Sequence, residues 1–343
     1  FYIYRLPGGS EFIGGIGTVR NGLYPGYVIS SFYNDPEATV SIVFEKDLPF
    51  DAIDSIFKDV SETQSETGSR SLLYPFPEFS TDKATYLNDV RNIVSLLDNG
   101  EKTVYSRVIS GDESIDIKES LSSLSSYFPN AFVFCFHTPQ TGTWIGATPE
   151  KLLQSKNGML STVALAGTRV VSDNIDQPEW DQKNIEEQNM VTLYIFSIFK
   201  SSGIQVQSDI SPKSKRVGKL EHLCTEFNAL SPGNMGETEL LDFLYRLSPT
   251  PALCGYPKEK GYSIINSTED FSRAYYGGFT GPYFSEREFT FYVILRSLRF
   301  TLSRWCMYAG GGITADSIPE AEWEETCRKA SSILDRIIYT EKE

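Results

Sequence analysis

Carboxylates gather at the start of a predicted helix near the C-terminus. The segment PEAEWEET places four of them within six residues: Glu320, Glu322, Glu324 and Glu325. The positive end of a helix dipole stabilises acidic side chains in the first turn, and Pro319 suits the first helical position. Glu322 also lies close to the apolar stripe of this helix, and a buried carboxylate needs a partner, a proton or a metal. This segment alone leaves two interpretations open, a solvated first turn and a cation site.

A second inward-facing carboxylate is predicted on a helix spanning about residues 184–201. The apolar face of this helix is formed by Val191, Tyr194, Ile195 and Ile198. Glu187 lies on the same line as that face. Carboxylates are ligands that Mg2+ prefers, and the i, i+3 spacing lets Glu322 and Glu325 point to one side of their own helix. The two sets of glutamates therefore predict a Mg2+ site.

The chain is acidic, with 31 Lys and Arg against 45 Asp and Glu and a net charge of −14. This charge argues against nucleic acid or an anionic membrane as partner. An anionic substrate would need a local reversal of the negative electrostatic field, which a bound divalent cation provides.

Five scattered cysteines and only two histidines argue against a disulfide framework and against a thiolate or histidine metal cage. No apolar run reaches the ~18 residues of a membrane helix and no signal-like segment opens the chain, so we expect a cytoplasmic protein.

Glycines and arginines supply further candidates, each with an ordinary alternative. AGGGIT, with Gly310–Gly312, and ALAGTR, at 164–169, leave backbone N–H groups open to an approaching carboxylate, or simply make tight turns. In VILRSLRF, Arg296 and Arg299 fall on opposite faces of one predicted strand, so at most one of them points inward. An inward arginine would clamp a carboxylate, whereas an outward one would lie in solvent.

Hydrophobic periodicity predicts the elements that position these residues. A helix is predicted at 84–100, and strands at 26–33, 38–45, 102–110, 130–139, 142–155, 287–302 and 304–314. The polar run at 61–71 predicts a loop or a lobe boundary. By default Lys102, at the start of a strand, is a surface lysine, and Glu150 is a cap or loop charge. Strands clustered as hairpins with helices between them indicate an α+β fold with large, mainly antiparallel sheets.

The combined motifs resemble those of the chorismate-utilising enzymes, in the same order and approximate spacing. They are GATPEKLL, ALAGTR, LEHLCTEF, SPTPALCGYPK, FSRAYYGGFTG, YVILR, YAGGGIT and EWEETCRK. The resemblance covers about residues 84–338 and is strongest to isochorismate synthases of the menaquinone or siderophore type. It implies the anthranilate synthase component I-like α+β fold, with large sheets packed together and helices outside. We expect a single domain over 1–343, with a strand-rich portion at 1–80 and a chorismate-binding catalytic region at 84–338.

The resemblance also implies roles for individual residues. Lys102 matches the general base that acts on water, and Glu150 matches the general acid that acts on the departing C4 hydroxyl of chorismate. Glu187 and Glu325 match the Mg2+ ligands, and Glu322 is a direct or water-bridged partner. An acid and a base on opposite ring faces are what water addition at C2 with loss of the C4 hydroxyl requires.

The other matching residues are expected to contact the substrate. Tyr276 and Arg296 match the clamp on the enolpyruvyl carboxylate, and His222 matches a histidine near the ring. The remaining matches line the ring pocket or offer backbone donors: Gly167, Thr168, Gly310, Gly311 and Gly312.

The motifs depart from the usual family pattern at two places, and other activities stay open as alternatives. Ser248 stands in SPTPA where the family usually has histidine, and the motif EEQNMV leaves Glu186 as an alternative to Glu187. Tyr276 also occurs in relatives that eliminate pyruvate, which keeps a salicylate synthase open. Lys102 favours water over ammonia as nucleophile, so an aminating anthranilate or aminodeoxychorismate synthase is disfavoured and no obligatory glutaminase partner is expected. A catalytically silent ligand-binding protein is the alternative of another class, and we expect a monomer or weak dimer.

Overall fold

The structure is a computed structural model that describes residues 1–343 apart from 68–71, 78, 171–178, 218–219, 234 and 341–343. For residues 63–67, 166–170, 183, 216–217, 220 and 222 it describes the backbone alone. The helices are α1 (Ile53–Thr67), α2 (Lys83–Leu96), α3 (Ile117–Tyr127), α4 (Gln182–Ser201), α5 (Glu237–Leu247), α6 (Lys258–Thr268) and α7 (Pro319–Leu334), with short 3-10 turns η1 (Pro36–Ala38) and η2 (Phe50–Ala52). The strands are β1 (Tyr2–Arg5), β2 (Ile13–Asn21), β3 (Gly26–Ser30), β4 (Val40–Asp47), β5 (Lys102–Gly111), β6 (Ile115–Asp116), β7 (Phe132–Thr138), β8 (Gly142–Thr148), β9 (Lys151–Lys156), β10 (Met159–Val170), β11 (Lys213–Val217), β12 (Leu220–Leu230), β13 (Gly255–Tyr256), β14 (Phe279–Ser285), β15 (Glu288–Val293), β16 (Ser297–Phe300), β17 (Trp305–Ile313) and β18 (Ile338–Tyr339).

Sixteen of the described strands form one continuous sheet in which neighbouring strands are antiparallel. Their order is β11-β12-β10-β9-β15-β14-β3-β4-β2-β1-β7-β8-β16-β17-β5-β13. β6 and β18 form a separate two-stranded ladder. The α+β class with a large, mainly antiparallel sheet is confirmed.

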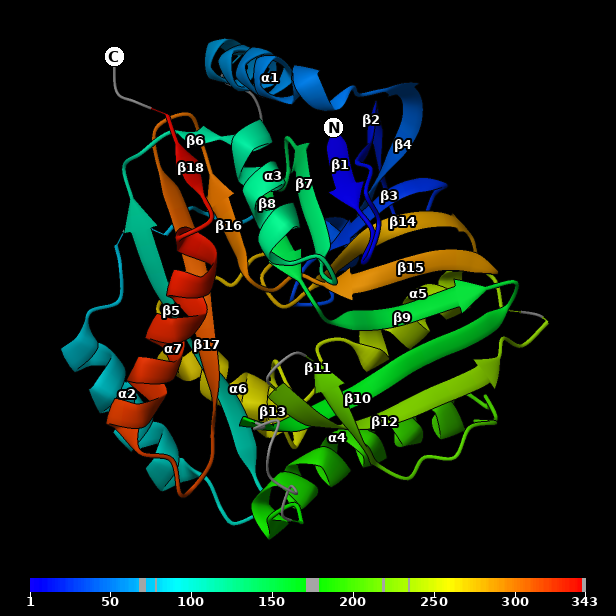
Figure 1. The fold of residues 1–343 in the computed structure, drawn as a ribbon, viewed down its shortest axis with the longest axis vertical. Helices are drawn as coiled ribbons and strands as arrows, with labels where there is room; N and C mark the ends of the chain where they lie inside the picture. Colours follow the sequence, from blue (N-terminus) through cyan, green and yellow to red (C-terminus); the bar gives the residue numbers. More distant parts are fainter. Residues whose placement is uncertain (68–71, 78, 171–178, 218–219, 234, 341–343) are drawn as a thin grey trace.

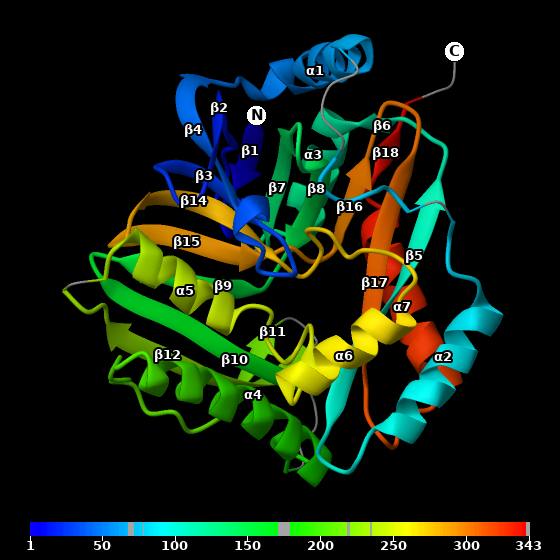
Figure 2. The same cartoon turned by 180° about the vertical axis from the view of Figure 1, so that it is seen from behind.

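Helices cover the two halves of this sheet on their outer faces. Figures 1 and 2 show α3 and α7 along the half that contains β7, β8 and β17, and α4 along β10 and β12. One apolar core lies under α3 and α7, and a second lies under α4 and α5. A third core, rich in aromatic rings, includes Tyr27, Phe134 and Tyr308. The third core is formed by the sheet faces opposite those that the helices cover.

Strand β7 shows why the sheet can bury both faces. Its sequence FVFCFHT is buried throughout. Val133 and Cys135 belong to the core under α3, whereas Phe132, Phe134 and Phe136 belong to the aromatic core. Because successive side chains point to opposite faces, a continuous apolar run is required wherever a strand has packing on both sides.

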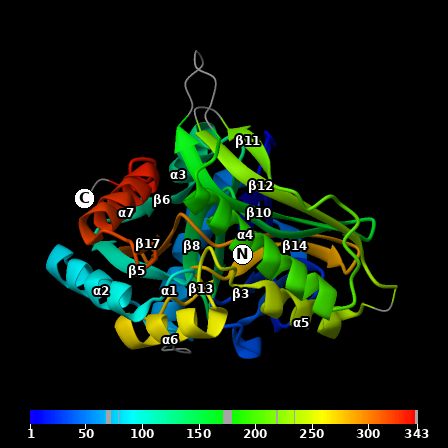
Figure 3. The same ribbon diagram turned by 90° about the horizontal axis from the view of Figure 1, so that it is seen from below.

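The lower end of β5 and β17 is surrounded by helices. Seen from below, α2, α6 and α7 lie around these two strands (Figure 3). α7 begins with Pro319 at its first turn, as predicted, although the capping residue is Ile318, which provides no side-chain cap. α4 is capped by Asp181, whose carboxylate accepts from the Asn184 N–H at 2.8 Å. These helix starts determine where the glutamates of both helices lie.

The structure corrects three predictions about elements. The stretch 142–155 was predicted as one strand, but it forms β8, which ends at Thr148, and β9, which begins at Lys151. The polar run at 61–71 was predicted to be a loop or a lobe boundary, but α1 continues to Thr67, because the last residues of this helix include no glycine or proline. Residues 68–71 lie outside the described part. The segment VILRSLRF is not one strand: β15 ends at Val293, β16 begins at Ser297, and Arg296 between them has φ +49°. β15 pairs with β9 and β14, whereas β16 pairs with β8 and β17. The left-handed conformation of Arg296 turns the chain between these two sets of neighbours.

The strands of residues 1–80 continue the sheet formed by residues 84–338. β1 pairs with β7, and β3 pairs with β14. The single domain over 1–343 stays a prediction. Within the described ranges, none of the helices combines the length and the apolar character needed to cross a membrane.

Candidate active site

The pairing of β5 with β17 brings Lys102 beside the glycine triplet. Gly312 is the partner of Val104 and Gly310 is the partner of Ser106. A Cβ atom added at Gly312 would lie 3.0 Å from Lys102 Nζ and closer still to its Cε. Glycine at this position therefore leaves the space that the lysine side chain occupies.

Lys102 meets the first turns of α4. Its Nζ donates to Oε1 of Glu187 at 2.5 Å, and the lysine side chain is only 11% exposed. The two residues are far apart in sequence, and the cap at Asp181 starts α4 so that Glu187 reaches β5. The side chain expected by default at the surface is thus enclosed and ion-paired.

The first turns of α7 face the same glycines. A Cβ at Gly311 would lie 3.2 Å from Oε2 of Glu322 and 4.0 Å from Oε1 of Glu325. Ser317 Oγ donates to Oε1 of Glu322 at 2.8 Å. Lys329 Nζ pairs with Oε1 of Glu325 at 2.6 Å and donates to the Gly310 carbonyl at 2.9 Å. Two predicted metal ligands therefore converge on Gly311.

The donor chemistry of these glutamates fits Mg2+, which prefers carboxylate oxygens. Glycine at position 311 also keeps a side chain out of the space before Glu322 and Glu325. In the described part of the chain, no three His, Cys, Asp or Glu side chains form a group that could hold a metal ion as they stand. Glu187 and Glu325 each contact a lysine, so these carboxylates are neutralised by Lys102 and Lys329.

Glu150 follows β8 and lies beside the segment that carries Arg296. Val293 N–H donates to the Glu150 carbonyl at 2.9 Å, and Ala147 N–H donates to the Arg296 carbonyl at 3.1 Å. Burial raises the pKa of the Glu150 carboxyl from 4.5 to about 7, against the opposing effect of Arg296, Lys102 and Lys329. A carboxyl with this pKa can hold a proton near neutrality and release it.

Tyr276 lies next to the Arg296 segment and reaches β17. Gly277 N–H donates to the Ile294 carbonyl at 2.8 Å, which joins the two segments. The Tyr276 ring stacks on Tyr308 at 5.4 Å, and a Cβ at Gly310 would lie 3.2 Å from the Tyr276 hydroxyl. Burial raises the pKa of Tyr276, so its phenol keeps its proton and can donate a hydrogen bond.

The other predicted ring-pocket residues can be placed only by their backbones. Thr168 of β10 is the register partner of His222 of β12, and Gly167 lies at an irregularity between Ala166 and Thr168. The side chains of Thr168 and His222 lie outside the described part. Arg299, the other arginine of VILRSLRF, is buried and donates to the carbonyls of Tyr74 and Pro75 at 2.8 and 2.9 Å.

Lys329 contacts the site but had no predicted role. It lies in the motif EWEETCRK, four residues after Glu325, and this i, i+4 spacing is a signal that could have identified it. Glu269 and Arg273, a buried ion pair with the same spacing, had no predicted role either.

Comparison with known proteins now assigns the family. The family model described as "Chorismate binding enzyme" matches residues 25–338. The chain belongs to the chorismate-binding enzymes. The match begins well before residue 84, where the resemblance was predicted to start, so the family likeness includes β3 and β4.

Two isochorismate synthases are similar in sequence to this chain. Isochorismate synthase MenF of Bacillus subtilis is 30% identical over 269 residues, covering 75% of this chain and 56% of that protein. Isochorismate synthase EntC of Escherichia coli is 28% identical over 244 residues, covering 68% and 62%. The chain thus spans less than two thirds of the length of these relatives.

Solved structures show the same fold. The menaquinone-specific isochorismate synthase MenF of Escherichia coli has a TM-score of 0.73 and 21% identity, covering 98% of this chain and 88% of that one. Anthranilate synthase component I of Streptococcus pneumoniae has a TM-score of 0.62 and 18% identity, covering 93% and 80%. The anthranilate synthase component I-like fold predicted from the motifs is confirmed.

Proposed function

We propose that this chorismate-binding enzyme is a Mg2+-dependent isochorismate synthase. The reaction adds water at C2 of chorismate and expels the C4 hydroxyl, so reactant and product are isomers. The observation that carries the proposal is Glu150, an enclosed carboxyl whose pKa is raised to about 7 and which interacts electrostatically with Lys102. A proton donor and an amine base in one site are what this reaction requires.

In the proposed reaction Lys102 takes a proton from the attacking water while Glu150 gives a proton to the departing hydroxyl. The O–H bond of the attacking water breaks as an N–H bond forms on Lys102, and a C–O bond forms at C2. The ring double bond shifts, the C4–O bond breaks, and the leaving oxygen takes the proton of Glu150 and departs as water. The low exposure of the Lys102 side chain keeps bulk water away from the base. Glycine at position 312 leaves the lysine room to approach the ring.

Glu187, Glu322 and Glu325 are the proposed Mg2+ ligands. The ion would supply positive charge for the ring carboxylate of the substrate and hold it in place. Lys329 would add a second positive charge there, since its Nζ lies between Glu325 and the Gly310 carbonyl. A chain with a net charge of −14 needs such local positive charge to bind a dicarboxylate.

Tyr276 and Arg296 are proposed to hold the enolpyruvyl carboxylate. Their segments are joined by two backbone hydrogen bonds, from the Gly277 N–H to the Ile294 carbonyl and from the Ile294 N–H to the Gly278 carbonyl. Arg296 also lies within electrostatic reach of Glu150. A protonated phenol and a guanidinium both donate to a carboxylate. Gly167, Thr168 and His222 are proposed to line the ring, and Gly310–Gly312 to offer backbone donors.

The test is incubation of the purified chain with chorismate and Mg2+, with and without EDTA, followed by chromatography of the products. Isochorismate that forms with Mg2+ and is lost with EDTA supports the proposal. Salicylate with pyruvate would assign a salicylate synthase, and an aminated product formed with ammonia would assign an aminating enzyme. Absence of turnover with Mg2+ and either nucleophile would refute catalysis and leave a ligand-binding protein.

A further inference from the structure

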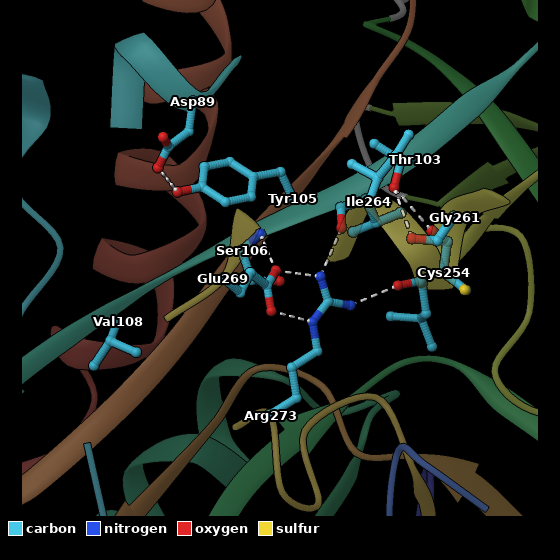
Figure 4. Close-up of polar contacts among 12 residues, drawn as sticks. Asp89, Thr103, Tyr105, Ser106, Val108, Cys254, Gly261, Ile264, Glu269 and Arg273 are labelled. Carbon is cyan, nitrogen blue, oxygen red and sulfur yellow. Dashed lines mark hydrogen bonds and ion pairs between the residues drawn. The ribbon is translucent and has the colours of Figure 1, made fainter. Parts of the chain in front are cut away.

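A fully buried ion pair lies behind the candidate site. The side chains of Glu269 and Arg273 are 1% and 0% exposed, and Arg273 Nε donates to Oε2 of Glu269 at 2.8 Å (Figure 4). Arg273 Nη2 makes a second contact with Oε1 of Glu269. Taking two charges out of water is costly, so a buried pair is a weak source of stability by itself.

The pair lies at the edge of β5, beyond the residues that pair with β13. β13 pairs with β5 at Lys102 and Thr103. Beyond that point, Ser106 N–H donates to Oε1 of Glu269 at 2.8 Å, and Arg273 Nη2 donates to the Val104 carbonyl at 2.6 Å. The two side chains thus bind the backbone groups that a neighbouring strand would otherwise bind.

The same arginine fixes the segments on either side. Arg273 Nη1 donates to the Leu253 carbonyl at 2.8 Å, which ties in the loop before β13. Tyr276 N–H donates to the Arg273 carbonyl at 2.9 Å, so the turn that presents Tyr276 starts at this residue. Figure 4 shows the guanidinium between β5 and the loop that carries Cys254.

We infer that the Glu269–Arg273 pair positions Lys102 and Tyr276 relative to each other. This inference rests on the proposed function, in which Lys102 is the base and Tyr276 holds a substrate carboxylate. Neither residue of the pair is proposed to touch the substrate; both act through the backbone of β5 and the turn at 273–276. The pair is a positioning device because its two side chains bind three backbone groups, two on β5 and one on the loop before β13. These contacts link β5 to the turn at 273–276.

Two conservative variants test the inference, because each keeps both charges and leaves no buried ion unpaired. Glu269→Asp is one methylene too short to reach both Ser106 and Arg273. Arg273→Lys keeps the positive charge but loses the planar fork that binds Glu269, Val104 and Leu253 together. Asp54→Glu is the matched control, since Asp54 accepts from the Ile117 N–H at 2.8 Å and lies on α1, away from the site.

The readouts are the melting temperature, hydrogen exchange of the peptide covering 102–107, and kcat and KM for chorismate with Mg2+. We expect both variants to fold, to exchange faster at 102–107, and to lose about tenfold or more in kcat/KM, since a displacement of ~1 Å can cost about 100-fold. The control should lower the melting temperature while exchange at 102–107 and kcat stay at wild-type values. Lower melting temperatures with unchanged exchange and kcat in both variants would show that the pair only stabilises the fold.

A further measurement uses the wild-type chain and needs neither a folded variant nor turnover. If the pair holds the edge of β5, the amide of Ser106, which donates to Glu269, should exchange only through global unfolding. Faster exchange of this amide by local opening would overturn the inference. A wild-type chain that does not convert chorismate would refute the proposed function, and the exchange data would still decide whether the pair holds β5.

Discussion

Gly312→Ala should remove activity without removing stability. The added Cβ would lie 3.0 Å from Lys102 Nζ and nearer to Cε, whereas ordinary contacts begin at 3.4 Å. The lysine end must therefore shift by about 1 Å, and a shift of this size can cost about 100-fold in rate, or about 2.7 kcal/mol in activation free energy. The atoms that must move are the far end of a flexible side chain, and Gly312 does not have a positive φ. Folding is therefore expected to be unaffected or stabilised by up to about 1 kcal/mol, because alanine restricts the unfolded chain.

The assay compares kcat for isochorismate formation with the melting temperature in the same buffer. Gly233→Ala is the matched control, since no heavy atom lies within 4 Å of the Cβ that it adds. It should leave both quantities unchanged. Gly312→Ala with wild-type kcat would refute the placement of Lys102 as the base beside Gly312, and a large loss of stability would refute the claim that only a side-chain end must move.

The remaining predictions concern the acid, the base and the metal ligands. Lys102→Ala should abolish turnover while circular dichroism and the melting transition stay like those of the wild type; full activity would contradict its role as base. Glu150 must be protonated to act, so kcat/KM should fall as pH rises through about 7, and a rate unaffected by pH between about 6 and 8 would exclude it as the acid. The pKa of the Glu150 carboxyl is 4.5 in its ordinary environment and about 7 in the folded chain, so the folded state binds this proton more tightly than the unfolded state does. The free energy of unfolding of the wild type should therefore fall as pH rises from about 4.5 to about 7. In Glu150→Gln this pH dependence should be weaker. Glu325→Gln should weaken Mg2+ binding by calorimetry at least about tenfold, whereas Glu320→Gln, an exposed neighbour paired with Arg91, should not; equal effects would remove Glu325 from the ligand set.

Local patterns predicted the elements of the site well. The helix at 184–201 appears as α4 and the strand at 102–110 as β5, because each has a long stretch of one hydrophobic period. The prediction was wrong at VILRSLRF, where a continuous β-like pattern hides the break at Arg296. A single left-handed residue leaves no periodic signal, since its neighbours keep the composition of strands on both sides.

The contacts of the site could not be predicted in the same way. Lys102 was by default a surface lysine, and the structure encloses it beside Glu187 of a distant helix. Lys329 was overlooked because its spacing from Glu325 alone suggests an ordinary surface pair. Its contact with the Gly310 carbonyl depends on the packing of α7 against β17.

The sequence by itself determined which groups are available: carboxylates at two helix starts, a lysine at a strand start, a glycine triplet, and an ordered set of motifs that indicates the family. The tertiary structure alone decided which of these groups meet and how acidic they are. Strand order sets β5 beside β17 and lets α4 reach Lys102, and enclosure by distant segments raises the pKa of Glu150. The physical reason is that periodicity is a property of neighbours along the chain, whereas pairing and desolvation depend on residues brought together by the whole fold.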